Sequence, residues 1–134
     1  MSGLVLKLNP RERVLVNGAV IENGDRRSRL SIITPNANIL RLRDAIKPNE
    51  VNTPVRRVCY IAQLVLSGDV SEEDAQHQIL RGIEQLSQAL RDDDSRIHLD
   101  IATEAVGNLD FYRTLKSLRN LLQREARLLG MITE

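Results

Sequence analysis

The stretch Asn17–Arg29, NGAVIENGDRRSR, decides the fold class because it places a short apolar run between two tight-turn signals. Each Asn-Gly pair tolerates the positive φ angles that a two-residue hairpin turn needs. Ala19, Val20 and Ile21 lie between the two pairs and are compatible with a short β-strand. The stretch therefore predicts two consecutive β-hairpins.

Similar short apolar runs lie on both sides of this stretch, and turn residues such as Pro10 and Pro35 separate them. We therefore expect five strands, at residues 4–8, 13–16, 19–22, 29–34 and 38–42. Strands this short and this closely spaced form a small antiparallel sheet or barrel. The first predicted unit is this basic antiparallel β module, residues 1–52.

The pattern changes to helical periodicity from Thr53 onward, where Thr53-Pro54 resembles an N-cap followed by proline in the first turn. Further start signals stand at Ser71, Asp92 and Asp110, and glycines mark the ends. We expect four helices, at residues 53–68, 71–90, 92–107 and 110–130. The fold class predicted is therefore α+β, with a helical domain at residues 53–134.

The two halves of the chain carry opposite net charge, although the whole chain carries only +1. Residues 1–57 hold eleven Lys or Arg against five Asp or Glu, a net charge of +6. Residues 58–134 hold eight against thirteen, a net charge of −5. A basic half suggests a polyanionic partner, whereas opposite charges also allow the halves to attract each other, within one chain or between copies.

Known catalytic and metal-binding motifs are absent from the sequence, which has no GxSxG, no phosphate-binding glycine loop and no dinucleotide fingerprint. His77 and His98 each lack a cysteine or second histidine at ligand spacing. Cys59 falls in an apolar helix, where cysteine behaves as a small hydrophobe. We therefore expect no enzyme activity, no cofactor and no metal.

No run of residues is apolar enough to span a bilayer, and the first residues lack the basic-then-apolar pattern of a secretion signal. A lone cysteine forms no internal disulfide. These features predict a cytoplasmic protein.

Arginines, and not aromatic residues, are the candidates for contacting a polyanion. Tyr60, Phe111 and Tyr112 are the only aromatic residues, so the β half lacks the stacking side chains of many RNA-binding sheets. Arginine contacts phosphate or guanine in bidentate fashion. The predicted RNA-binding residues are Arg11, Arg13, Arg26, Arg27, Arg29, Arg41 and Arg43. The alternative is a charge run that is only solvated.

Several motifs together resemble the FlbT flagellum-biosynthesis repressor family of alphaproteobacteria, over the whole length of the chain. The most specific is the string NGAVIENGDRR. The residues that carry the resemblance are Leu6-Lys7-Leu8, Pro10, Glu12-Arg13, Asn17–Arg27 and Thr53–Arg57.

This resemblance implies a post-transcriptional regulator of flagellin synthesis. Members of the family act on the 5′ untranslated leader of flagellin mRNA, lowering its translation and stability during flagellum assembly, and some relatives act positively. The family is also linked to FlaF, a small partner in flagellin synthesis. The implied partners are thus the flagellin mRNA leader and FlaF or flagellin, with the basic β half contacting the RNA.

An alternative function is a protein-interaction or chaperone-like module that contacts flagellin or FlaF through its helices. Leu115, Leu118 and Leu122 would then line an apolar groove, although the same spacing is typical of a helix packed in a core. Sheet edges and the opposed charges of the halves also favour self-association, and we expect a homo-oligomer.

Overall fold

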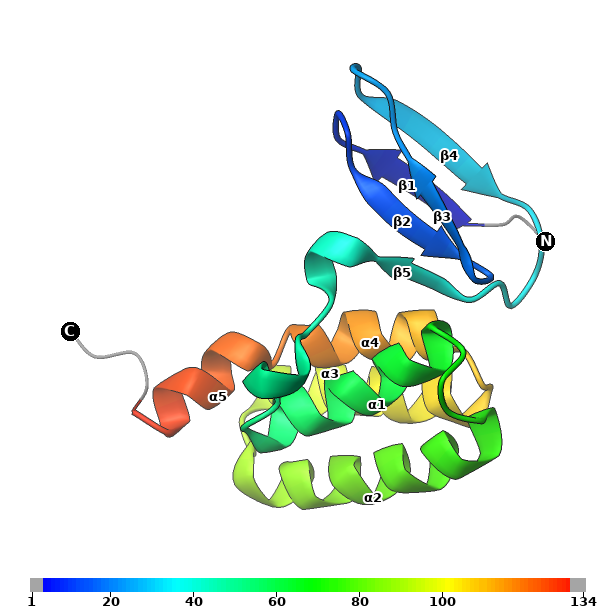
Figure 1. Ribbon diagram of the computed structural model, residues 1–134. Coiled ribbons are helices and arrows are strands. Elements are labelled where there is room, and N and C mark those ends of the chain that lie inside the picture. The colour runs from blue at the N-terminus through cyan, green and yellow to red at the C-terminus, as the bar shows by residue number, and fades with distance from the viewer. Residues whose placement is uncertain (1–3, 131–134) are drawn as a thin grey trace.

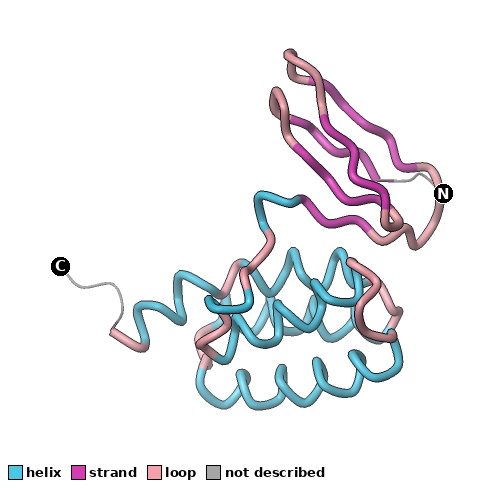
Figure 2. The backbone as a smooth tube through the Cα atoms, in the orientation of Figure 1, coloured by secondary structure: helices cyan, strands magenta, loops and turns pink. Residues whose placement is uncertain are grey.

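The computed structural model describes residues 4–130 and confirms the α+β architecture. The chain forms five short strands first and then five α-helices. Figure 1 shows the strands above the helices, with β5 as the strand nearest to them, and Figure 2 shows strands and helices in separate parts of the molecule.

The strands form two antiparallel sheets. In one, β1 (Leu4–Leu8) pairs with β4 (Ser28–Ile32). In the other, β2 (Arg13–Val16) lies between β3 (Ala19–Glu22) and β5 (Ile39–Arg41). The five predicted strands are thus confirmed, with β4 and β5 shorter than expected, and over residues 4–130 they do not close into a barrel.

The first Asn-Gly pair makes the predicted hairpin turn between β2 and β3. Asn17 has a φ of 47° and Gly18 a φ of 87°, the left-handed conformations that such a turn requires. The pairing of β2 with β3 continues up to the turn, where Val16 is opposite Ala19. This part of the prediction is confirmed.

The prediction of a second hairpin at Asn23-Gly24 is wrong, because β4 pairs with β1 and not with β3. The side chain of Asn23 explains the difference. Its amide nitrogen donates to the backbone carbonyls of Asn9 (2.8 Å) and Arg26 (2.9 Å), and its oxygen accepts from the Ser28 hydroxyl (2.7 Å). These bonds hold an open loop that carries the chain from one sheet to the other.

A small hydrophobic cluster lies between the two sheets. Its fully buried members are Leu6 and Leu8 of β1, Val14 of β2 and Ile39 of β5. Strict alternation along β1 turns these leucines inward and leaves Val5 and Lys7 on the outer surface.

Helical N-caps agree closely with the sequence signals. The side chains of Thr53, Ser71, Asp92 and Asp110 each accept a hydrogen bond from a backbone N–H in the first turn of the helix that follows. The helices are α1 (Pro54–Leu66), α2 (Glu72–Ala89), α3 (Asp93–Gly107), α4 (Phe111–Arg119) and α5 (Leu122–Leu128).

The last predicted helix is divided into α4 and α5. At the break, the N–H groups of Asn120 and Leu121 bond to carbonyls three residues back, at Ser117 (3.2 Å) and Leu118 (3.0 Å). This tightening ends the α-helical ladder. Within residues 4–130, no helix combines the length and apolar character needed to cross a bilayer.

The first helix, α1, lies at the centre of the helical core and packs against α2 and α4. Glu125 of α5 is buried and accepts a hydrogen bond from the N–H of Val55 (2.7 Å), so its carboxylate satisfies a backbone donor at the start of α1. Gln63 of α1 holds the connector by two hydrogen bonds to the backbone of Ile46 (2.7 and 3.0 Å).

The connector between β5 and α1 contains two short 3-10 helices, η1 (Leu42–Asp44) and η2 (Pro48–Glu50). Leu40 of β5 is buried in the helical core, and Tyr112 of α4 packs against both hydrophobic clusters. The division into separate domains at residues 1–52 and 53–134 stays a prediction.

A close approach of α1 and α2 gives a first test of this packing. A Cβ added at Gly82 of α2 would lie 2.6 Å from Cγ2 of the buried Val58. Such overpacking costs about 1–3 kcal/mol, more than the roughly 0.8–1 kcal/mol that alanine gains over glycine in a helix. We expect Gly82→Ala to lower the free energy of unfolding measured by urea denaturation.

The matched control is Gly107→Ala at the end of α3, where an added Cβ meets no atom within 4 Å. The helical propensity of alanine acts there without a clash, so this variant should be as stable as the unaltered protein or more so. If Gly82→Ala were the more stable of the two variants, the packing described for α1 and α2 would be wrong.

Candidate nucleic-acid interface

Two cations face each other on the outer surface of the β1–β4 sheet. Lys7 of β1 is directly opposite Arg29 of β4, and both side chains are exposed. Among residues 4–130, neither has an acidic group within 4 Å. Like charges directly opposite in a sheet are destabilising, so this pair is not explained by the stability of the fold.

Arg26 and Arg27 extend this positive charge into the loop before β4. Both are exposed, and neither has an ion-pair partner among the described residues. The bond from Asn23 to the carbonyl of Arg26 fixes the path of the loop. We call Lys7, Arg26, Arg27 and Arg29 the basic face.

Arg11 and Arg13 differ from these residues because both have acidic partners. Arg11 lies 2.7 Å from a carboxylate oxygen of Asp25 and 3.4 Å from one of Glu22. Arg13 bonds Glu22 at 2.9 Å, and this hydrogen bond lowers the pKa of Glu22. The positive charge of both arginines is therefore largely balanced at this corner.

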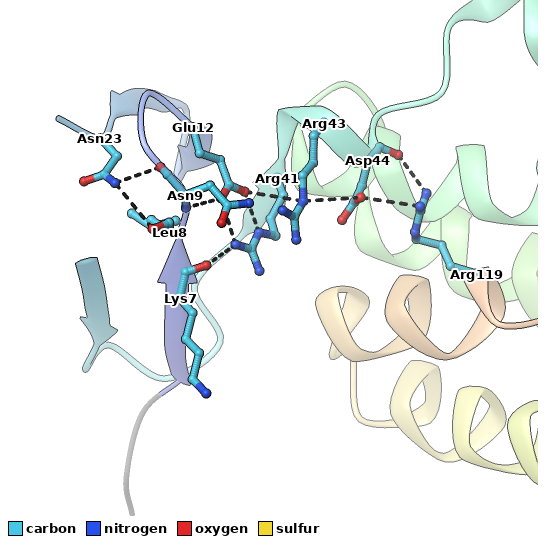
Figure 3. Close-up of polar contacts among 9 residues, drawn as sticks. All are labelled: Lys7, Leu8, Asn9, Glu12, Asn23, Arg41, Arg43, Asp44 and Arg119. Carbon is cyan, nitrogen blue, oxygen red and sulfur yellow. Dashed lines mark hydrogen bonds and ion pairs between the residues drawn. The ribbon is translucent and has the colours of Figure 1, made fainter. Parts of the chain in front are cut away.

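Arg41 is held in a bidentate ion pair with Glu12 (Figure 3). Its Nε and Nη2 atoms lie 2.7 and 3.0 Å from the two carboxylate oxygens, and Nη2 also donates to the carbonyl of Lys7. The Glu12 side chain is only 5% exposed, and the N–H of Asn9 donates to it at 3.0 Å. The hydrogen bond from Arg41 lowers the pKa of Glu12. Because its guanidinium is bonded to both Glu12 and the Lys7 carbonyl, Arg41 is a structural residue.

A chain of alternating charges continues from this pair to α4 (Figure 3). Nε of Arg43 lies 3.6 Å from the Glu12 carboxylate and 3.9 Å from Asp44. Arg119 of α4 approaches the Asp44 carboxylate at 3.4 Å and donates to its backbone carbonyl at 3.0 Å. Arg43 thus stands at the junction of the β strands and the helices.

The seven predicted arginines therefore fall into three groups in the structure. The fold brings Arg26, Arg27 and Arg29 together on one exposed face, pairs Arg11, Arg13 and Arg41 with acids, and places Arg43 at the junction with α4. Lys7 was not among the predicted residues. Its position between Leu6 and Leu8 was the available signal, because period-two alternation places it on the outer face.

The remaining reactive side chains have structural surroundings. Cys59 is buried, and burial raises the pKa of its thiol to about 12, so it is not a thiolate near neutral pH. Within residues 4–130, no three His, Cys, Asp or Glu side chains gather in a way that would hold a metal ion.

A family model described as "Flagellar protein FlbT" matches residues 4–129 of the chain. The flagellum biosynthesis repressor protein FlbT of Caulobacter vibrioides is 27% identical over 130 residues, covering 97% of this chain and 92% of the relative.

A probable flagellum biosynthesis repressor protein, FlbT 1 of Bradyrhizobium diazoefficiens, is 34% identical over 129 residues, covering 95% of this chain and 85% of the relative. A protein named likewise as a probable repressor in Brucella anthropi is 28% identical, with 94% and 82% covered. No solved structure matches the chain.

The ion pair of Glu12 and Arg41 gives a prediction about stability and pH. Removing one partner of a buried pair leaves the other charge uncompensated and costs about 3–5 kcal/mol. We expect Glu12→Gln to lose a stabilisation of that order near neutral pH. The folded pKa of Glu12 lies below its usual value of 4.5, so the stabilisation is present above that pH and is lost as the pH falls through the folded pKa.

Urea denaturation at a series of pH values measures both effects. The difference between Glu12→Gln and the unaltered protein should shrink in acid. Glu22→Gln is the matched control, because Glu22 pairs with Arg13 on the surface, where solvent screens the interaction. Equal losses in the two variants would show that the Glu12 pair has no special role.

Proposed function

Because the chain belongs to the FlbT family of flagellar proteins, we propose that it regulates flagellin synthesis after transcription by binding the 5′ untranslated leader of flagellin mRNA. In this proposal, binding represses translation and promotes degradation of the message during flagellum assembly. The names of its relatives support a repressor of flagellum biosynthesis, and the basic face is the proposed RNA contact.

The observation that carries the proposal is the Lys7–Arg29 pair. The two cations stand directly opposite each other, and no acid lies nearby among the described residues. Their mutual repulsion opposes folding of the sheet to a small extent. A polyanion would convert this repulsion into binding energy, because each phosphate neutralises charge and releases counterions. Arg26 and Arg27 extend the same surface along the loop, as an extended strand of phosphates requires.

Contacts of this kind position an RNA and give affinity, but they do not identify its sequence. The other predicted arginines contribute less in this proposal, because acids balance Arg11 and Arg13 and Glu12 occupies Arg41. Sequence selection therefore needs a further contact with a base.

The alternative function, a protein-binding groove on the helices, has less support. Leu115 and Leu118 are 5% and 0% exposed and belong to the helical core, and Leu122 packs against it. These three leucines therefore hold the helices together and do not present an apolar groove. FlaF and flagellin stay predicted partners without an assigned surface.

The double variant Lys7→Ala/Arg29→Ala separates function from folding. Removal of the opposed charges should leave stability unchanged or slightly raised. It should weaken binding of the flagellin leader about tenfold and reduce the dependence of log affinity on log salt by about 0.7 for each phosphate that the variant no longer neutralises. Fluorescence anisotropy of labelled leader RNA at several salt concentrations measures both quantities.

The control is Arg57→Ala/Arg81→Ala, which removes two exposed cations from α1 and α2 and so changes net charge equally. This control should bind the leader nearly as the unaltered protein does. A scrambled RNA of equal length tests selectivity. Unchanged leader affinity in Lys7→Ala/Arg29→Ala would exclude the basic face as the RNA contact.

A further inference from the structure

A cleft of about 370 Å³ lies between the end of β5, the η1 turn and the side of α4 that faces them. Its volume falls within the range of about 300–1,000 Å³ that is usual for small-ligand sites. The polar groups that line it include Arg43, Asp44, Tyr112, Lys116, Arg119 and Asn120.

The cleft is positively charged. Arg43, Lys116 and Arg119 contribute three cations, and Asp44 contributes one carboxylate. Arg41 also lines the cleft, but Glu12 balances its charge. The surplus of two positive charges suits an anionic ligand with one or two phosphates.

Several lining groups have unused hydrogen-bonding capacity. Within residues 4–130, no hydrogen bond uses the guanidinium of Arg43, the ammonium of Lys116 or the hydroxyl of Tyr112. The amide nitrogen of Asn120 donates to the Lys116 carbonyl at 3.3 Å, which leaves its amide oxygen without a donor among the described residues. The cleft therefore offers cationic donors beside a neutral acceptor, the combination that recognises a phosphate and a base edge.

Tyr112 gives the cleft an aromatic wall. The ring is half-buried, and burial raises the pKa of its hydroxyl, so the residue stays neutral at physiological pH. It also borders two adjoining hollows, one beside Ile33 and one beside His98. Aromatic faces of this kind stack on any nucleobase, and the basic face has none.

We propose that this cleft receives one unpaired nucleotide of the bound RNA, with its phosphate on Lys116 and Arg43 and its base against Tyr112 and Asn120. The inference rests on the proposed function and adds to it the base contact that the basic face lacks. Asp44 accepts from an exocyclic amino group of the base, which favours adenine, cytosine or guanine over uracil.

Arg41 lies between the cleft and β1, the strand that carries Lys7. This side chain donates to the carbonyl of Lys7 on one side and lines the cleft on the other. Figure 3 shows Lys7 and Arg43 on either side of it. In this proposal, a single RNA strand passes from the β1–β4 surface over Arg41, whose charge Glu12 balances, to the cations Arg43 and Lys116 beside α4.

The test uses the full chain and flagellin leader RNA in the anisotropy titration at several salt concentrations. Lys116→Ala and Asn120→Ala alter exposed side chains, so both should keep the melting temperature of the unaltered protein. We expect Lys116→Ala to lower affinity several-fold and to reduce the salt slope by about 0.7, the value of one phosphate contact on a single strand. Asn120→Ala should lower affinity without changing the slope.

Arg81→Ala is the matched control for Lys116→Ala, because Arg81 is an exposed cation on α2, the helix farthest from the strands in Figure 1. It should leave affinity and slope unchanged. Photocrosslinking of leader RNA that carries 6-thioguanosine, which keeps an exocyclic amino group, adds a positional readout. Peptide mapping should place a crosslink within residues 112–120.

The outcomes separate the two proposals. If Lys7→Ala/Arg29→Ala weakens leader binding while Lys116→Ala and Asn120→Ala bind normally and residues 112–120 are not crosslinked, the cleft proposal is overturned and the proposed function stands. If the unaltered protein does not bind the leader more tightly than scrambled RNA, the proposed function is overturned, and the cleft proposal with it.

Discussion

The ion pair of Glu12 and Arg41 is the interaction on which the arrangement of this protein depends. A carboxylate that is 5% exposed needs a charged partner and further donors, and Arg41 and the N–H of Asn9 supply them. The same guanidinium bonds the carbonyl of Lys7, so one side chain joins β1, β5 and the turn that precedes β2. With β5 fixed in this way, the following η1 turn carries Arg43 and Asp44 to α4.

The strands and helices could be predicted because their signals are local. Thr53, Ser71, Asp92 and Asp110 act as N-caps where the sequence suggested, since a cap needs only the next three residues. The second Asn-Gly pair could not be assigned on the same basis. The partners of Asn23 include the carbonyl of Asn9, fourteen positions away, and no local pattern distinguishes that bond from a hairpin turn.

The candidate interface was predictable only in part, for the same reason. Arginines are visible in a sequence, but their partners are not: Glu12 and Arg41 are separated by 29 positions, and Asp44 and Arg119 by 75. Only the folded chain therefore separates the arginines that pair with acids from Arg26, Arg27 and Arg29, which have no ion-pair partner among residues 4–130. Tyr112 is a comparable case, since its sequence placed it among the helices and the fold brings it against the strands.

The opposite charges of the two halves allowed two explanations, and the ion pairs distinguish between them within one chain. Among residues 4–130, Asp44 and Arg119 form the only ion pair that joins residues 1–57 to residues 58–134. In that pair the acid comes from the basic half and the base from the acidic half, so the contact neutralises none of the excess. The positive charge of the β half is therefore not compensated by the helices. Lys7, Arg26, Arg27 and Arg29 keep it at the surface, which is the condition that binding to a polyanion requires.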